Sequence, residues 1–65
     1  MILECIDEVR VDHDDGKRYL FEERDRFGYV YEVDEALGEM ALATGKVVEL
    51  TDYEGPTEIP SWGLG

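Results

Sequence analysis

Apolar and polar residues alternate over residues 3–12, the pattern of a β-strand that buries one face. Asp7 interrupts the apolar row and predicts a bulge or the end of a sheet. Two further runs, over residues 18–24 and 29–34, alternate in the same way. Together the three runs predict an antiparallel meander. Its apolar face consists of Leu3, Cys5, Val9, Val11, Tyr19, Phe21, Tyr29, Tyr31 and Val33.

The residues between the first two runs predict their register. A two-residue turn would bring an apolar face opposite a polar one, because a slip of one residue reverses every side chain. A three-residue loop over residues 14–16, with its final glycine in the left-handed conformation, matches the faces. We therefore expect Val11 opposite Tyr19 and Val9 opposite Phe21.

A second loop of the same kind is expected over residues 26–28, between the second and third runs. It also ends in the glycine that such a loop needs. It would pair Phe21 with Val33 and Glu23 with Tyr31. All three runs would then be neighbours in one sheet.

The period of the apolar residues becomes helical after Asp34, which is a suitable N-cap. Glu35 is favourable in the first turn of a helix, and Gly45 can end the segment. A second hairpin around residues 44–46 is the alternative for residues 36–44, although the helix is favoured. Residues 46–51 are strand-like in both interpretations.

The last eleven residues, 55–65, are rich in proline and glycine and are expected to be irregular. Trp62, with Ile59 and Leu64, either folds back over an open sheet edge or presents an anchor to a partner, and inward packing is favoured. The predicted fold is α+β: a single compact domain over residues 1–65, with three to four antiparallel strands and one short helix after the third strand.

The composition of the chain gives information about its function as well as its fold. The 65 residues contain 17 Asp and Glu against 6 Lys and Arg, which gives a net charge of −11. With 43% hydrophobic and 11% aromatic residues, the chain can bury a core, unlike acidic disordered segments. Such a charge repels phosphate backbones and anionic lipids, so we expect neither direct nucleic-acid binding nor membrane docking.

Signals for export are absent from the sequence. The first residues show neither a basic start nor a long apolar stretch, and no apolar run approaches the length of a membrane span. We therefore expect a cytoplasmic protein, in a host bacterium if a phage encodes it. Cys5 is the one cysteine and is interpreted as a core residue.

Catalytic and metal-binding chemistry find little support in the sequence. His13, the one histidine, lies in an acidic turn, and paired carboxylates are inevitable in so acidic a chain. A calcium loop aligned on Gly16 would place Val11 and His13 at ligand positions that require oxygen. Cys5 and His13 do not supply four zinc ligands. We expect no enzyme activity, no cofactor and no metal site.

The carboxylates are more informative. In the expected register, Glu8, Glu22 and Glu32 form a row across the outer face of the sheet. Opposed like charges destabilise a sheet by up to about 1 kcal/mol per pair, so stability alone does not explain this row. Extended onto the helix, it predicts a ridge of anions that contacts a basic partner. The predicted partner-binding residues are Glu4, Glu8, Asp12, Glu22, Glu32, Asp34, Glu35 and Glu39.

Two interpretations of the charge remain open. The first is that the ridge imitates a phosphate backbone and occupies a basic groove. The second is adaptation to high salt, since the chain has no Asn or Gln and two lysines, and the acids would then serve solubility. An antitoxin or small regulator that masks a basic surface uses the same electrostatics as the first.

In size, charge and the carboxylate row of Glu8, Glu22 and Glu32, the chain resembles, as a class, small acidic phage proteins, especially anti-CRISPR proteins and other DNA mimics. The resemblance implies stoichiometric inhibition by a monomer. The expected partner is a basic DNA-binding protein or complex, such as a Cas protein in a Cascade-like complex of a type I system. It implies no cofactor.

Overall fold

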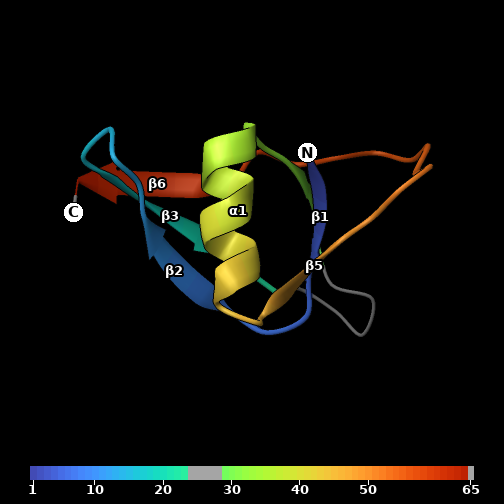
Figure 1. The fold of residues 1–65 in the computed structure, drawn as a ribbon, viewed down its shortest axis with the longest axis horizontal. Coiled ribbons are helices and arrows are strands. Elements are labelled where there is room, and N and C mark those ends of the chain that lie inside the picture. Colours follow the sequence, from blue (N-terminus) through green and yellow to red (C-terminus); the bar gives the residue numbers. More distant parts are fainter. Residues whose placement is uncertain (24–28, 65) are drawn as a thin grey trace.

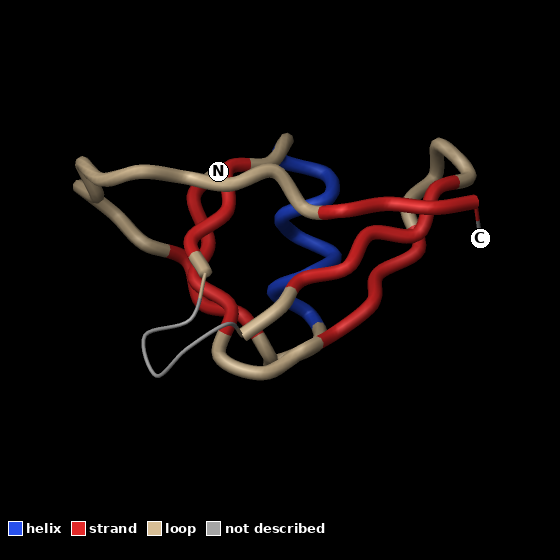
Figure 2. Tube along the Cα trace, turned by 180° about the vertical axis from the view of Figure 1, so that it is seen from behind, coloured by secondary structure: helices blue, strands red, loops and turns tan. Residues whose placement is uncertain are grey.

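The computed structural model describes residues 1–23 and 29–64, which form six antiparallel strands in two sheets and one α-helix (Figure 1). The predicted α+β class is confirmed, with more strands than the three to four expected. The expected turn over residues 26–28 lies outside the described residues. The two sheets stand on either side of the helix, as the view from behind also shows (Figure 2).

Sheet A has the order β4 (Val30–Glu32), β1 (Ile2–Cys5) and β5 (Val47–Glu49), with β1 antiparallel to both neighbours. Sheet B has the order β2 (Val9–Asp12), β3 (Lys17–Phe21) and β6 (Ser61–Leu64). Each sheet turns one face to the core and leaves the other outside. The two sheets therefore share a core but have separate outer faces.

The β2–β3 hairpin has the predicted register, with Val9 opposite Phe21 and Val11 opposite Tyr19. Gly16 has a φ of 83°, the left-handed conformation that glycine adopts without a steric penalty. Its amide donates to the carbonyl of His13 over 3.1 Å. The prediction succeeded because a short loop leaves few registers open.

Asp7 marks the end of a sheet, one of the two outcomes that the sequence predicted. The alternating segment is divided at residues 6–8 into β1 of sheet A and β2 of sheet B. The amides of Ile6 and Asp7 donate to the carbonyl of Lys46 at 2.9 and 3.2 Å. These bonds tie the bend to the segment before β5.

The expected pairing of the third run with the second is wrong. Its strand, β4, pairs with β1, and Tyr31 lies opposite Leu3. Alternation predicts which face of a strand is buried but does not say which strand lies beside it. The hydroxyl of Tyr31 still reaches the end of the second run, where it accepts a hydrogen bond from the amide of Glu22 over 2.9 Å.

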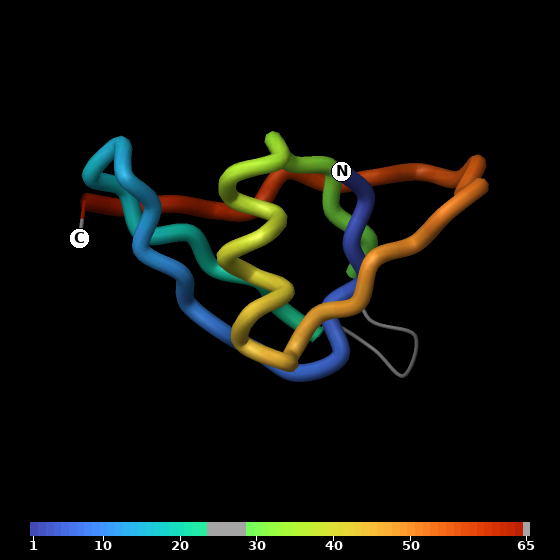
Figure 3. Tube along the Cα trace, in the orientation of Figure 1, coloured from blue at the N-terminus to red at the C-terminus, as the bar shows by residue number. Residues whose placement is uncertain are grey.

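The C-terminal segment is not irregular throughout, contrary to the prediction. Residues 61–64 form β6, which pairs with β3 and places Trp62 opposite Tyr19. The chain between β5 and β6 runs out to a turn and returns past the N-terminus to sheet B (Figure 3). Pairing with β6 covers the edge of β3, because β6 supplies backbone partners there.

The segment after β4 forms the helix α1 (Glu35–Ala43), so the alternative hairpin is wrong. Asp34 is the N-cap, as predicted, and Gly45 follows the helix with a φ of 76°. The helix lies across the opening between the two sheets (Figure 1). Gly38 faces the side chain of Met1 so closely that an added Cβ would overlap the Met1 sulfur.

The core joins both sheets and the helix. Cys5, Phe21 and Tyr31 are buried, as expected, and Tyr19 and Tyr29 are half-buried. Phe21 and Tyr31 meet edge to face, with their ring centroids 5.1 Å apart, which is a favoured aromatic geometry. The buried residues are Leu3, Cys5, Val11, Phe21, Tyr31, Leu37, Ala41 and Val47.

Inward packing of the C-terminal apolar side chains is not observed. Trp62 is 54% exposed, Ile59 83% and Leu64 88%. The ammonium of Lys17 lies 4.1 Å from the centroid of the Trp62 ring, in a cation–π contact. The backbone of the segment thus folds back onto a sheet edge, while its large side chains stay at the surface.

Candidate partner interface

The predicted row of Glu8, Glu22 and Glu32 does not exist. Glu8 precedes β2, Glu22 follows the end of β3, and Glu32 belongs to β4 in the other sheet, opposite Ile2. The row depended on the pairing of the second and third runs, which the structure replaces with β4–β1 pairing. Glu8 and Glu22 flank the last β2–β3 pair, Val9 opposite Phe21, whereas Glu32 lies in the other sheet.

The eight predicted partner-binding residues are distributed over several elements. Glu4 and Glu22 are partly buried, and the other six are exposed. Asp12 lies on the outer face of sheet B, where it is bound to Arg18. The residues that the structure does bring together are Glu32, at the end of β4, and Asp34 and Glu35, at the start of α1.

Glu32 and Asp34 line a hollow of about 210 Å³, which we call the acidic hollow. One wall is formed where the chain crosses toward β6, at Ile59 and the buried Pro60. The hollow therefore combines two carboxylates with apolar walls. Its lining residues are Tyr19, Glu32, Val33, Asp34, Leu37, Ile59 and Pro60.

Asp34 has a fixed position in this hollow. Its Oδ1 accepts a hydrogen bond from the amide of Leu37 over 2.7 Å, which satisfies a free donor of the first helical turn. Its Oδ2 lies 3.7 Å from Nε2 of His13. Asp34 thus connects the helix to the β2–β3 hairpin.

The side chain of His13 is largely buried beside Tyr19, with ring centroids 5.9 Å apart. Its Nδ1 has no hydrogen-bond partner among the described residues. The Tyr19 hydroxyl donates to Oδ2 of Asp15 over 2.9 Å, and this hydrogen bond raises the pKa of Tyr19. The hairpin loop is therefore tied to the wall of the acidic hollow.

Ion pairs are unevenly distributed. Within residues 1–23 and 29–64, the pairs are Arg10–Glu8, Arg18–Asp12, Lys46–Asp7 and His13–Asp34, at 3.7, 2.7, 3.9 and 3.7 Å. The other acids from β4 onward have no cation partner within those residues. These unpaired acids, together called the acidic surface, are Glu32, Glu35, Glu39, Glu49, Asp52, Glu54 and Glu58.

The acidic surface continues onto the outer face of sheet A. Glu4 lies opposite Val30 and Val48, and Glu32 lies opposite Ile2 on the same face. Glu4 and Glu32 are thus diagonal neighbours on adjacent strands. Val48 is exposed and the other apolar residues of this face are partly exposed. The face therefore offers carboxylates interleaved with apolar groups.

The buried titratable groups differ from these surface acids. Burial raises the pKa of the Cys5 thiol and of the Tyr31 hydroxyl above their ordinary values, because an apolar environment disfavours the charged form. The Cys5 thiol donates to the carbonyl of Asp7 over 3.1 Å. Among the described residues, no three His, Cys, Asp or Glu side chains are grouped as a metal site would require.

Sequence reasoning missed the apolar part of the acidic hollow. Ile59 and Pro60 were assigned to an irregular tail, and nothing in the local pattern places them beside α1. Val33 was expected on the apolar face and is half-buried, and Leu37 is buried.

The described part of the chain contains no helix with the length and apolar character needed to cross a bilayer. Comparison with known proteins finds no matching family model, curated protein or solved structure.

Proposed function

We propose that this protein is a stoichiometric inhibitor that occupies the basic groove of a nucleic-acid-binding protein in place of DNA. The observation that carries the proposal is the acidic surface, whose exposed carboxylates have no cation partner in the described residues. A groove lined with Lys and Arg supplies the missing cations. Inhibition of this kind needs no turnover and no cofactor.

The arrangement of the acids supports this electrostatic role. Glu35 and Glu39 are four residues apart on α1 and both are exposed, so their repulsion costs the helix a few tenths of a kcal/mol. A basic partner would relieve that repulsion. Contact with a groove that normally neutralises phosphates would also release bound counterions, which makes binding tight at low salt and weaker at high salt.

The acidic hollow adds a specific contact to this general attraction. A Lys or Arg side chain has a long apolar stem and a charged end. The stem fits against Ile59 and Leu37, and the charged end meets Glu32 and Asp34. Charge alone would bind any basic surface, whereas a shaped hollow favours a partner with a cation at the matching position.

The first partner to test is the DNA-binding channel of a Cascade-like complex of a type I CRISPR–Cas system. The experiment measures displacement of labelled target DNA from the purified complex by increasing amounts of this protein, over a series of salt concentrations. We expect inhibition at about one protein per complex, weakening as salt shortens the screening length. DNA binding that is unchanged at excess protein would contradict the proposed target.

Charge-reversal variants test the surface itself. Glu32→Lys, Glu35→Lys and Glu39→Lys combined change the net charge from −11 to −11 + 6 = −5. A matched control combines Asp7→Lys, Asp14→Lys and Glu23→Lys, which gives the same net charge on exposed residues elsewhere. The first variant should lose inhibition and the control should keep most of it. An equal loss of inhibition in both variants would show that inhibition depends on the net charge and not on these three residues.

A second candidate is an acidic structural or regulatory module adapted to high salt. The observation that favours it is that acids occur on both sheets, on the helix and in the connecting loops. Circular dichroism over a salt series separates the candidates. The inhibitor should be folded in dilute buffer, whereas the halophilic module should need molar salt to fold.

An antitoxin that masks a basic toxin surface is a further form of the first candidate, because it differs only in its partner. The genes beside this one would distinguish them: a toxin gene would favour the antitoxin, and phage structural genes would favour the defence inhibitor.

A further inference from the structure

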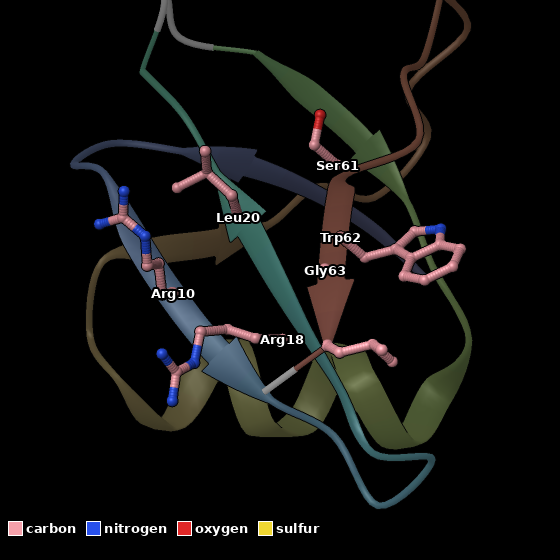
Figure 4. A pocket seen from close by; sticks show the side chains of 7 residues that line it. Arg10, Arg18, Leu20, Ser61, Trp62 and Gly63 are labelled. Carbon is pink, nitrogen blue, oxygen red and sulfur yellow. The ribbon is translucent and has the colours of Figure 1, made fainter.

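The outer face of sheet B contains a shallow hollow of about 260 Å³, and no residue of the acidic surface lines it (Figure 4). We call it the arginine hollow. Arg10 and Arg18 lie on one side of it, and Leu20 and Gly63 form part of its floor. Two cations beside an apolar floor are unusual in a chain with 17 acidic and 6 basic residues.

The hollow exists because β6 presents small residues on this face. Gly63 lies opposite Arg18, and Ser61 lies opposite Leu20. Apart from Gly63 and its two chain neighbours, no residue has an atom within 4 Å of the position that a Cβ on Gly63 would occupy. A larger residue at position 63 would therefore fill the hollow without displacing its neighbours.

Both arginines keep donors for a ligand. Arg18 binds Asp12 through Nε at 2.7 Å and through Nη2 at 3.5 Å, so its Nη1 takes no part in that pair. Nη1 of Arg10 lies 3.7 Å from Oε2 of Glu8, beyond hydrogen-bond distance. The side chains are 61% and 51% exposed. Guanidinium groups with free N–H donors favour carboxylates, which accept two such bonds at once.

The volume of the hollow and the net charge of the protein restrict the class of ligand further. Sites for drug-sized molecules occupy about 300–1,000 Å³, so this hollow holds little more than one apolar side chain. The protein's charge of −11 repels polyanions. The ligand that fits is compact and apolar and carries one negative charge beside its apolar group. The last residue of a protein chain meets this description when its side chain is apolar.

We propose that the arginine hollow binds the C-terminal apolar residue of another protein chain. The α-carboxylate contacts the guanidinium groups of Arg10 and Arg18, and the side chain packs on Leu20 over the space beside Gly63. This inference is independent of the proposed function, because it uses the opposite charge and a different sheet. It makes the protein a two-sided binder, with a basic partner on one side and a chain end on the other.

The test uses the acetylated peptide Gly-Gly-Ala-Leu with a free C-terminal carboxylate, and the same peptide with a C-terminal amide. Binding to the whole protein is followed by NMR, from the Leu20 methyl groups, the Gly63 amide and the arginine Nε–H signals. We expect the free acid to shift these signals and the amide to bind about tenfold more weakly, because a charge-assisted hydrogen bond is lost. Equal affinities, or no shift at millimolar peptide, would overturn the proposal.

Two variants test the two halves of the hollow. Gly63→Val should abolish peptide binding and leave the circular dichroism spectrum unchanged, because the added side chain occupies open space. Arg10→Gln should reduce the difference between the free acid and the amide. Lys46→Gln, a matched control, removes one cation beside Asp7. It should change neither peptide binding nor the difference between the free acid and the amide. Peptide binding that survives Gly63→Val in a folded protein would place the ligand elsewhere.

Discussion

Sheet A and sheet B share one core but differ in their margins and in their charge. In sheet A, the central strand β1 buries Leu3 and Cys5 completely. In sheet B, the edge strand β6 has four exposed residues. The arginines of sheet B are paired with neighbouring carboxylates, whereas the acids of sheet A and α1 are largely unpaired. Core packing thus depends on β1 in sheet A, whereas β6 in sheet B contributes exposed residues.

This difference shows that short strands of one fold can contribute unequally to the stability of the protein and to its binding surfaces. β1 is flanked on both sides and contributes Leu3 and Cys5 to the core, so truncating these side chains should destabilise the fold. β6 has one neighbour, β3, among the described strands, and its side chains can change with little cost to the fold. The surface near β6 is therefore free to serve binding.

The largest expected effect distinguishes these two strands. Leu3→Ala should lower the free energy of unfolding by about 2–5 kcal/mol, because Leu3 is fully buried and its loss leaves a cavity. Leu64→Ala, which removes a side chain that is 88% exposed, should stay within about 0.5 kcal/mol. Urea unfolding followed by circular dichroism measures both. Similar losses would show that β6 is as important to the core as β1.

A smaller effect is expected at the junction of the two sheets. Asp34→Ala removes the N-cap of α1 and should cost about 1 kcal/mol, within a usual range of 0.5–2. Asp34→Ser keeps an oxygen that can accept from the Leu37 amide and should restore most of the stability. If both variants lost the same amount, the charge facing His13, rather than the cap, would be the stabilising contribution.

The smallest effect concerns the paired charges of sheet B. The hydrogen bond from Arg18 holds the pKa of Asp12 below its ordinary value of 3.8. The stabilisation from this carboxylate is therefore present above the ordinary pKa and is lost as the pH falls through the lowered value. Arg18→Gln should raise the pKa of Asp12, measured by NMR titration. Arg10→Gln, the matched control, should leave it unchanged.

Local features of the fold were predictable from the sequence, and long-range pairings were not. The register of the β2–β3 hairpin follows from a loop of three residues, and the N-cap at Asp34 follows from the residues beside it. Pairing of β4 with β1, and of β6 with β3, joins segments far apart in the chain. Alternation specifies the buried face of Tyr31 but leaves its neighbouring strand undetermined.

The candidate site shows the same limit. Individual acids such as Glu32 and Asp34 were predicted to contact a partner, and the structure places both on the acidic hollow. The row failed at Glu32, because the step from Glu22 to Glu32 depended on a long-range pairing that the structure replaces with β4–β1 pairing. The apolar wall at Ile59 could not be inferred, since it requires the chain to return across the molecule before β6.

The contact between Gly38 and Met1 has a consequence for anyone who modifies this protein. Replacing glycine with alanine inside a helix is a common way to increase stability, and it usually gains up to about 1 kcal/mol. Here the added methyl group would overlap the Met1 sulfur. The residue that weakens α1 by itself is thus the one that lets the first side chain lie on the helix, and replacing it with alanine would require the Met1 side chain to move.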